Sequence, residues 1–172
     1  MIEREITYLA KELPSGLKDC PFKEIIDVYI PWSIDHPKLR LRKNGDIYEL
    51  TKKEPINGDV SCQEEQTIIL NEIEFNALNK LDGKRVAKHR YYYDYQGRRA
   101  EFDIFQEALA GLVVIDFEFD TEEEKNSFIM PDFCLADITT ETFIAGGIIC
   151  GKTYDNIQSD VDRYNYQKLY LP

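Results

Sequence analysis

The chain has 172 residues, of which 43% are hydrophobic and 31% are charged, and its net charge is −11. These values predict one soluble globular domain over residues 1–172 with a buried core. The acidic balance excludes sequence-independent nucleic-acid binding, which needs lysine and arginine to neutralise phosphates, and we expect no sequence-specific nucleic-acid partner. An anionic ligand therefore needs a locally basic surface or a metal ion.

The chain carries no signal for a membrane or for secretion. No apolar run approaches the roughly 18 residues of a membrane-spanning helix, and the charged start at residues 1–5 is unlike a signal peptide. The four cysteines have no close spacing, which predicts reduced thiols rather than disulfides or a zinc site. We therefore expect a cytoplasmic protein without a membrane partner.

Strands dominate the predicted secondary structure. Apolar and polar residues alternate with a period of two in several segments. These segments are residues 2–10, 24–30, 39–42, 48–53, 62–70, 85–93, 99–106, 112–119 and 134–138. Asn44-Gly45 predicts a two-residue hairpin, and Gln96-Gly97 predicts a turn further along the chain. Short strands in meander order with few helices predict a barrel or a sandwich.

Few helices are expected. Residues 71–81 begin at a candidate asparagine cap and place apolar residues at helical spacing. Residues 121–124 predict a threonine-capped helix start with carboxylates in its first turn. Residues 155–172 predict a C-terminal helical tail, helical over 155–168, that packs on the sheet or forms a homodimer contact.

The two faces of each predicted strand differ in polarity. The apolar face holds Leu39, Leu41, Tyr48, Leu50, Phe102, Ile104, Phe117 and Phe119. The opposite face is charged, and the charges are sorted by sign from strand to strand. Its acidic pairs are Glu3 with Glu5, Glu101 with Asp103, and Asp116 with Glu118, whereas its basic residues are Arg40, Arg42, Lys53, Lys88 and Arg90.

A charged face on an amphipathic strand is usually just solvated. Sorting by sign over five strands favours another interpretation, because like charges on one face repel unless something of opposite charge bridges them. A divalent metal ion bridges carboxylates, and a phosphate chain bridges arginine and lysine. If the sheet closes with these faces inward, the cavity suits a metal-chelated phosphate chain, and the outward apolar faces need helices as cover.

At these residues the sequence resembles the CYTH, or triphosphate tunnel, superfamily, which includes inorganic, thiamine and RNA triphosphatases and class IV adenylyl cyclases. The N-terminal E-x-E-x-K strand of the family corresponds to Glu3-Arg-Glu5-Ile-Thr7. The later motifs correspond to Arg40-Leu-Arg42, Thr51-Lys-Lys53, Lys88-His-Arg90, Glu101-Phe-Asp103-Ile-Phe105 and Asp116-Phe-Glu118. The resemblance covers residues 2–145. It implies a mainly β (α+β) fold, a closed antiparallel eight-stranded β-barrel tunnel with a few covering helices.

The resemblance also implies a function, which is the divalent-metal-dependent hydrolysis of a triphosphate. The substrate would be inorganic tripolyphosphate or a small organic triphosphate, and the cofactor Mg²⁺ or Mn²⁺. The residues that would bind the phosphates are Arg40, Arg42, Lys53, Lys88 and Arg90. Those that would bind metal are Glu3, Glu5, Asp103, Asp116 and Glu118, and the catalytic candidates are Glu3, Glu5 and Lys53.

Departures from the family pattern leave alternatives open. Thr7 stands where relatives have a lysine, the R-x-E-x-E strand reads Cys62-Gln-Glu64-Glu65-Gln66, and the late arginine is replaced around Phe143. The site would therefore carry less positive charge than that of a typical triphosphatase. The alternatives are a catalytically impaired polyphosphate- or nucleotide-binding module, a class IV-type adenylyl cyclase, or a barrel whose charged face is only solvated.

Residues 146–153 match the P-loop pattern G-x-x-x-x-G-K-[ST]. A P-loop opens a helix after the first strand of a parallel sheet, whereas only 19 residues follow Thr153 and the upstream strands are predicted to be antiparallel. We therefore reject a P-loop. A milder hypothesis is that Lys152 partly replaces the positive charge missing at position 7.

Overall fold

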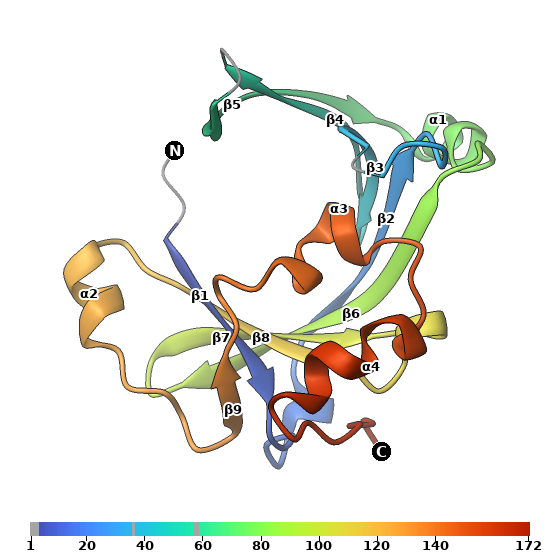
Figure 1. The fold of residues 1–172 in the computed structure, drawn as a ribbon. Coiled ribbons are helices and arrows are strands. Elements are labelled where there is room, and N and C mark those ends of the chain that lie inside the picture. Colours follow the sequence, from blue (N-terminus) through green and yellow to red (C-terminus); the bar gives the residue numbers. More distant parts are fainter. Residues whose placement is uncertain (1–3, 36, 57–58) are drawn as a thin grey trace. The chain divides into compact units, whose positions relative to one another are not determined.

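Nine strands and four α-helices form the regular structure of the computed structural model, which describes residues 4–35, 37–56 and 59–172, with the backbone alone for 53–56 and 59–65 (Figure 1). The strands are β1 (Glu5–Ala10), β2 (Phe22–Ile30), β3 (Leu39–Asn44), β4 (Ile47–Ile56), β5 (Asp59–Leu70), β6 (Lys84–Tyr95), β7 (Arg98–Phe105), β8 (Val113–Glu118) and β9 (Cys134–Asp137). The helices are α1 (Glu72–Leu78), α2 (Glu122–Ser127), α3 (Gly146–Ile149) and α4 (Tyr154–Asp162). Short 3₁₀ turns are η1 (Leu17–Asp19), η2 (Glu107–Leu109) and η3 (Thr142–Ile144).

The strands form one antiparallel sheet in the order β5-β4-β3-β2-β6-β7-β8-β1-β9. Strands β5 and β9 end this order, and within the described ranges no ladder joins them. The mainly β fold is confirmed, but the expected closed eight-stranded tunnel is wrong, because the sheet is open and has nine strands. Alternation within a strand decides which side chains share a face. Closure depends on strand tilt and stagger, which no local pattern encodes.

The chain divides into two compact units. Unit 1 comprises residues 1–23, 88–144 and 152–172, and unit 2 comprises residues 24–87 and 145–151. Strand β6 passes from one unit to the other, since its first four residues belong to unit 2 and the rest to unit 1.

The core of unit 1 lies on the predicted apolar face of β1, β7 and β8. Phe102 and Phe117 are fully buried at its centre. The ring of Phe133 lies 5.5 Å from that of Phe102, and the ring of Phe128 lies 4.7 Å from that of Phe117. Both covering rings come from the segment between β8 and β9 that contains α2. This segment, together with Leu17 of η1, covers the apolar face.

The core of unit 2 forms on the same kind of face. Val28, Leu41 and Phe75 are buried together, and the ring of Tyr48 lies 5.0 Å from that of Phe75. Phe75 belongs to α1, so this helix covers the apolar side of β2, β3 and β4. The strand faces predicted from alternation are thus confirmed in both units.

The predicted hairpins are confirmed with one shift. The turn between β3 and β4 lies at Gly45 and Asp46, one residue later than expected, because Asn44 still belongs to β3 and pairs with Ile47 of β4. Gly45 has a φ of 60°, a conformation that glycine adopts without strain. Gln96 and Gly97 both have positive φ, at 54° and 81°, as the tight β6–β7 turn requires.

The predicted helix starts are also confirmed. The side chain of Asn71 accepts a hydrogen bond from the third residue of α1, and the hydroxyl of Thr121 does the same for α2. The terminal helix α4 begins at Tyr154 and ends at Asp162, six residues before the predicted end at 168. Beyond it, the hydroxyl of Tyr166 bonds to β8 and to the preceding loop, which fixes the tail as non-helical chain.

Cys20 and Cys134 are free thiols, as predicted. No helix among the described residues is long and apolar enough to cross a membrane.

Candidate functional site

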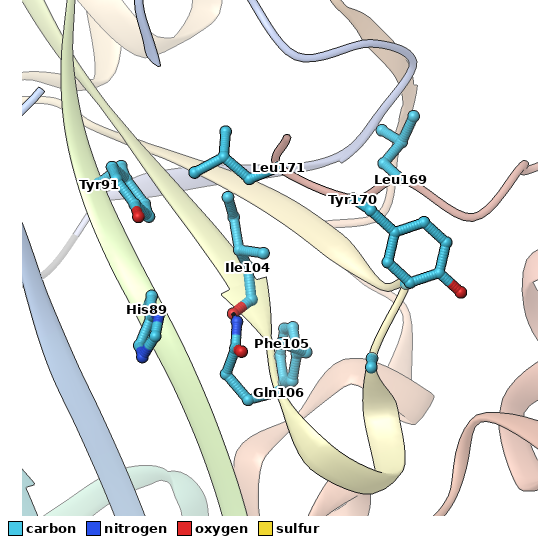
Figure 2. A pocket seen from close by; sticks show the side chains of 10 residues that line it. His89, Tyr91, Ile104, Phe105, Gln106, Leu169, Tyr170 and Leu171 are labelled. Atoms are coloured by element: carbon cyan, nitrogen blue, oxygen red, sulfur yellow. Dashed lines mark hydrogen bonds between the residues drawn. The ribbon is translucent and has the colours of Figure 1, made fainter. Parts of the chain in front are cut away.

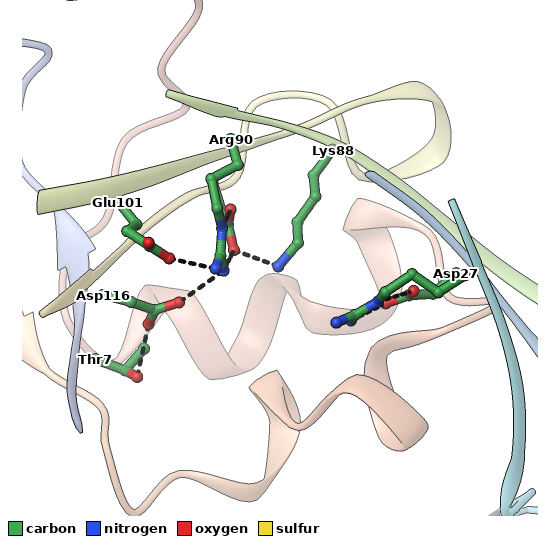
Figure 3. Close-up of polar contacts among 8 residues, drawn as sticks. Thr7, Asp27, Lys88, Arg90, Glu101 and Asp116 are labelled. Carbon is green, nitrogen blue, oxygen red and sulfur yellow. Dashed lines mark hydrogen bonds and ion pairs between the residues drawn. The ribbon is translucent and has the colours of Figure 1, made fainter. Parts of the chain in front are cut away.

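The predicted site residues of unit 1 that the structure describes lie on one face of β6, β7, β8 and β1, as the alternation predicts. Arg90 pairs with Asp103 across β6 and β7, and Glu101 pairs with Asp116 across β7 and β8. Residues that oppose one another across antiparallel strands share a face. The resulting polar group, which we call the Arg90 cluster, consists of Lys88, Arg90, Glu101, Asp103 and Asp116 (Figure 3).

Arg90 is the centre of this cluster. Its Nε and Nη2 donate to the two carboxylate oxygens of Asp103 at 2.6 and 2.7 Å. Nη2 also donates to Oδ2 of Asp116 at 3.1 Å, and Nη1 donates to Glu101. Lys88 donates to Asp103 as well. Carboxylates thus take four of the five N–H donors of the guanidinium, so Arg90 organises the acids as much as it offers charge to a ligand.

Burial and pairing set the charge states of the cluster. Burial favours neutral Asp103, but Lys88 and Arg90 outweigh it and lower the pKa of the Asp103 carboxyl. For Asp116 burial prevails, with the charge of Asp103 adding to it, and the pKa is raised. Burial also raises the pKa of Glu101 against the opposing charge of Arg90, with Glu118 contributing to the rise. Asp103 is therefore the firmly ionised partner, whereas Glu101 and Asp116 accept protons more readily than ordinary acids.

Thr7, the departure from the family lysine, takes part in this network. It pairs with Asp116 across β1 and β8, and its hydroxyl donates to Oδ1 of Asp116 at 2.8 Å. The backbone N–H of Thr7 donates to the hydroxyl of Thr139 at 3.0 Å. Thr7 is buried, so the place of the expected lysine is filled by a neutral hydrogen-bond donor.

The carboxylates predicted to bind metal differ in what surrounds them. Glu5 and Glu118 oppose each other directly across β1 and β8. Glu3 lies outside the described residues. Both oxygens of Asp103 already accept hydrogen bonds from cations. No group of three or more histidine, cysteine, aspartate or glutamate residues is close enough to hold a metal among the described residues.

In unit 2 the predicted phosphate-binding residue Arg42 is paired with an acid. Its Nε and Nη2 donate to the two oxygens of Asp27 at 2.6 and 2.7 Å (Figure 3). The two residues oppose each other across β2 and β3, and Asp27 is buried. The sequence reasoning missed Asp27, because a single acid in a mostly apolar strand has no partner until the pairing of β2 with β3 is known.

Arg40, two residues earlier on the same face, has a different neighbour. It opposes Tyr29 on β2 and Thr51 on β4. Burial raises the pKa of the Tyr29 hydroxyl, with the charge of Asp27 adding to the rise and Arg40 opposing it. Lys53 pairs with Glu65 in the β4–β5 ladder, and its side chain lies outside the described part of the chain. Arg40 and Arg42 thus lie on one face of β3, each opposite a polar residue of β2.

Comparison with known proteins places this charged sheet in a family. The chain is 31% identical over 144 residues to the inorganic triphosphatase of Nitrosomonas europaea, a match that covers 82% of this chain and 91% of that protein. The chain belongs to the CYTH superfamily. The crystal structure of the inorganic triphosphatase NE1496 superposes with a TM-score of 0.70 at 24% identity, covering 88% of this chain and 96% of that one. No protein-family model matches the chain.

Residues 146–153, which match the P-loop pattern in sequence, do not form a P-loop in the structure. Helix α3 covers only the first four of these residues, Gly146–Ile149. A Cβ atom on Gly146 would lie 2.5 Å from the hydroxyl of Tyr29, so this glycine serves a close side-chain approach. Thr153 bonds to Asn156 and caps α4. The rejection of a P-loop therefore stands on structural grounds.

A pocket of about 260 Å³ lies in unit 1 behind the charged face. Figure 2 shows His89 and Tyr91 of β6 on one side, Ile104 and Gln106 on the other, and Leu171 of the tail above them. Strand alternation directs His89 and Tyr91 away from the face that carries Lys88 and Arg90. This pocket is therefore not part of the candidate CYTH site.

Proposed function

We propose that the chain hydrolyses a triphosphate, with inorganic tripolyphosphate as the first candidate and a small organic triphosphate as the second. The observation that carries the proposal is the 31% identity with an inorganic triphosphatase over most of both chains. It is supported by the basic residues that share one face of β3 and by those of the Arg90 cluster. In this role the chain is a hydrolase acting on phosphoanhydride bonds.

The phosphate-binding residues in this proposal are Arg40, Arg42, Lys53, Lys88 and Arg90. Arginine forks hold phosphate oxygens in pairs, and the ammonium group of lysine adds a point charge. Asp103 accepts hydrogen bonds from both Lys88 and Arg90 and so holds the two cations close together. We assign it to orienting these cations. Positioning and charge stabilisation are the main contributions that a protein makes to phosphoryl transfer.

The donor set on β1 and β8 fits a divalent cation. Glu5 and Glu118 oppose each other directly across β1 and β8, so their carboxylates are near enough to share one cation. Mg²⁺ usually takes one or two carboxylates and completes its shell with phosphate oxygens and water, so two acids suffice. We propose Glu5 and Glu118 as ligands, together with Glu3 and with Asp116 nearby. Bound there, Mg²⁺ or Mn²⁺ would neutralise phosphate charge and orient the attacking water.

The test is phosphate release from tripolyphosphate, ATP and thiamine triphosphate, each with Mg²⁺ or Mn²⁺ and with EDTA as the control. Metal-dependent release from one of them is expected and names the substrate. Cyclic AMP from the ATP reaction would instead assign a class IV-type cyclase. No product from any substrate would remove the hydrolase proposal.

A second candidate, a phosphate-chain binding module without turnover, is favoured by one observation. Thr7, where relatives carry lysine, is committed to hydrogen bonds with Asp116 and Thr139. Titration calorimetry with tripolyphosphate and Mg²⁺ separates the two candidates. Binding without phosphate release would support the module, whereas binding with release would exclude it.

A further inference from the structure

The ion pair between Asp27 and Arg42 is unlike an ordinary surface salt bridge. The Asp27 side chain is only 5% exposed and the Arg42 side chain 25%. Both oxygens of Asp27 accept from one edge of the guanidinium fork, the edge made by Nε and Nη2. Two parallel hydrogen bonds to a buried carboxylate fix both the position and the plane of the guanidinium.

Stability alone does not account for a carboxylate at this place. Taking two charges out of water costs free energy that their attraction only partly returns, and apolar residues of similar size often stabilise a fold as well. An apolar side chain can pack on this face of β2, since Ile25, two residues before Asp27, is buried there. A buried bidentate pair does, however, specify one geometry.

Another pair on the same two strands provides the contrast. Lys43 donates to Glu24, also across β2 and β3, but on the opposite, apolar side of the strands. That pair is more exposed, with 27% and 43% of the two side chains accessible. It uses one nitrogen and one oxygen, so it leaves the lysine orientation loose. Asp27 differs in burial, in geometry and in lying on the face that carries Arg40.

We propose that Asp27 is a positioning residue that acts through Arg42, an inference that rests on the proposed triphosphate hydrolysis. By holding the Nε/Nη2 edge with two hydrogen bonds, Asp27 fixes the position and the plane in which the guanidinium of Arg42 meets a phosphate chain. The carboxylate also offsets the charge of Arg42, so this arginine orients a phosphate more than it attracts one. Arg40 opposes the neutral Tyr29, so of the two arginines of β3 it contributes more to the electrostatic attraction of the phosphate chain.

This division of roles predicts a split in the kinetic constants. Asp27→Asn keeps the size of the side chain but replaces one acceptor by a donor, so the guanidinium can no longer be held by two bonds. Misplacing a group by about 1 Å can cost on the order of 100-fold in rate. We expect kcat for tripolyphosphate with Mg²⁺ to fall about 10-fold or more, while KM stays unchanged or falls because a negative charge has been removed.

A double-mutant cycle tests whether Asp27 acts through Arg42. The variants are Asp27→Asn, Arg42→Gln and the double variant, which leaves a neutral pair of similar size. If Asp27 serves only to hold Arg42, adding Asp27→Asn to Arg42→Gln lowers kcat/KM no further, within about two-fold. Glu24→Gln is the matched control, because it removes a pair from the same strands on the other face, and its kcat and KM should stay within about two-fold of the parent values.

A readout without substrate separates this inference from the proposed function. The Nε–H signal of Arg42 in ¹⁵N NMR of the free protein should be protected from exchange, and Asp27→Asn, which can keep at most one of the two bonds, should weaken that protection whereas Glu24→Gln should not. Independent, multiplicative effects in the cycle, or an unprotected Arg42 signal in the parent protein, would overturn the inference. If the parent protein binds tripolyphosphate without turnover, the same cycle is run on the dissociation constant. Absence of both binding and turnover refutes the inference together with the proposed function, even with a protected Arg42 signal.

Discussion

The hydroxyl of Thr7 donates a hydrogen bond to Oδ1 of Asp116 over 2.8 Å, while Oδ2 of the same carboxylate accepts from Arg90. Position 7 is where CYTH relatives carry a lysine. Strand β1 of this chain therefore supplies a neutral hydrogen-bond donor to the Arg90 cluster, where a lysine would supply a positive charge. The substitution is accommodated locally, because Thr7 is buried and both its hydroxyl and its backbone N–H are bonded.

Thr7→Val removes the hydroxyl and keeps the shape. The carboxylate of Asp116 then loses one donor while it remains in a partly buried place, so we expect a loss of about 1 kcal/mol in the free energy of unfolding. Thr7→Ser keeps the hydroxyl, so its free energy of unfolding should fall clearly less. Urea denaturation at pH 7 measures both variants. A larger loss in Thr7→Ser than in Thr7→Val would show that the methyl group, not the hydrogen bond, is what matters.

Thr7→Lys places an ammonium group beside Asp116, as the family motif does. The added charge attracts the phosphate chain, so we expect kcat/KM for tripolyphosphate to rise about 10-fold, which corresponds to roughly 1.4 kcal/mol of transition-state stabilisation. Thr7→Met, similar in length but neutral, is the control and should not raise it. A gain of the same size in Thr7→Met, or a loss in Thr7→Lys, contradicts a charge effect at this position.

Asp103→Asn tests the buried acid that holds Lys88 and Arg90 together. Breaking a buried pair on one side leaves uncompensated charge, so we expect about 3 kcal/mol of destabilisation at pH 7. The lowered pKa of Asp103 means that its stabilising contribution is fully present above the ordinary value of 3.8 and is lost as the pH falls through the folded-state pKa. Urea denaturation between pH 7 and pH 3 should therefore show a shallower acid decline in Asp103→Asn than in the parent protein. An equally steep decline would assign the acid sensitivity to other groups.

Glu5→Gln removes one of the two facing carboxylates of β1 and β8. The amide oxygen is a weaker ligand for a hard cation than a carboxylate, so metal-dependent phosphate release should be abolished while the fold is retained. Circular dichroism checks the fold, and titration with Mn²⁺ checks the metal. Glu12→Gln, at an exposed acid just beyond β1, is the control. Unchanged turnover in Glu5→Gln would remove this acid from the proposed metal site.

The pairing partners explain how far sequence could anticipate this structure. The alternation in β3 correctly predicted that Leu41 points to the core and Arg42 to the charged face, because a strand has a fixed period of two. It could not predict that Asp27 faces Arg42, since that depends on the register between β2 and β3. The charges of the strands are sorted by sign, and this sorting suggested a ligand for each strand. In the Arg90 cluster it has another origin, because acids and bases pair across neighbouring strands.

The prediction of a closed tunnel was wrong for a related reason. The predicted apolar faces of both units are confirmed, yet among the described residues the sheet ends at β5 and β9. A pattern within one strand has no information about whether the first and last strands of a sheet meet. The tail shows the same limit. Helix α4 ends at Asp162, and four residues later the hydroxyl of Tyr166 bonds to β8 and to the preceding loop, a tertiary contact that helix propensity does not predict.

Arg90→Lys separates the structural role of Arg90 from its charge. Lysine keeps the charge but has no planar fork, so it cannot serve Asp103, Glu101 and Asp116 together. Arg90 opposes the burial that raises the pKa values of Glu101 and Asp116, so both should rise further in the variant. A folded state that binds protons more readily loses stability as the pH rises. The stability deficit of Arg90→Lys should therefore be larger at pH 7.5 than at pH 5, about 3 kcal/mol at the higher pH. Lys88→Arg, which retains charge and adds donors, is the control, and a deficit independent of pH would show that the fork of Arg90 does not govern the two acids.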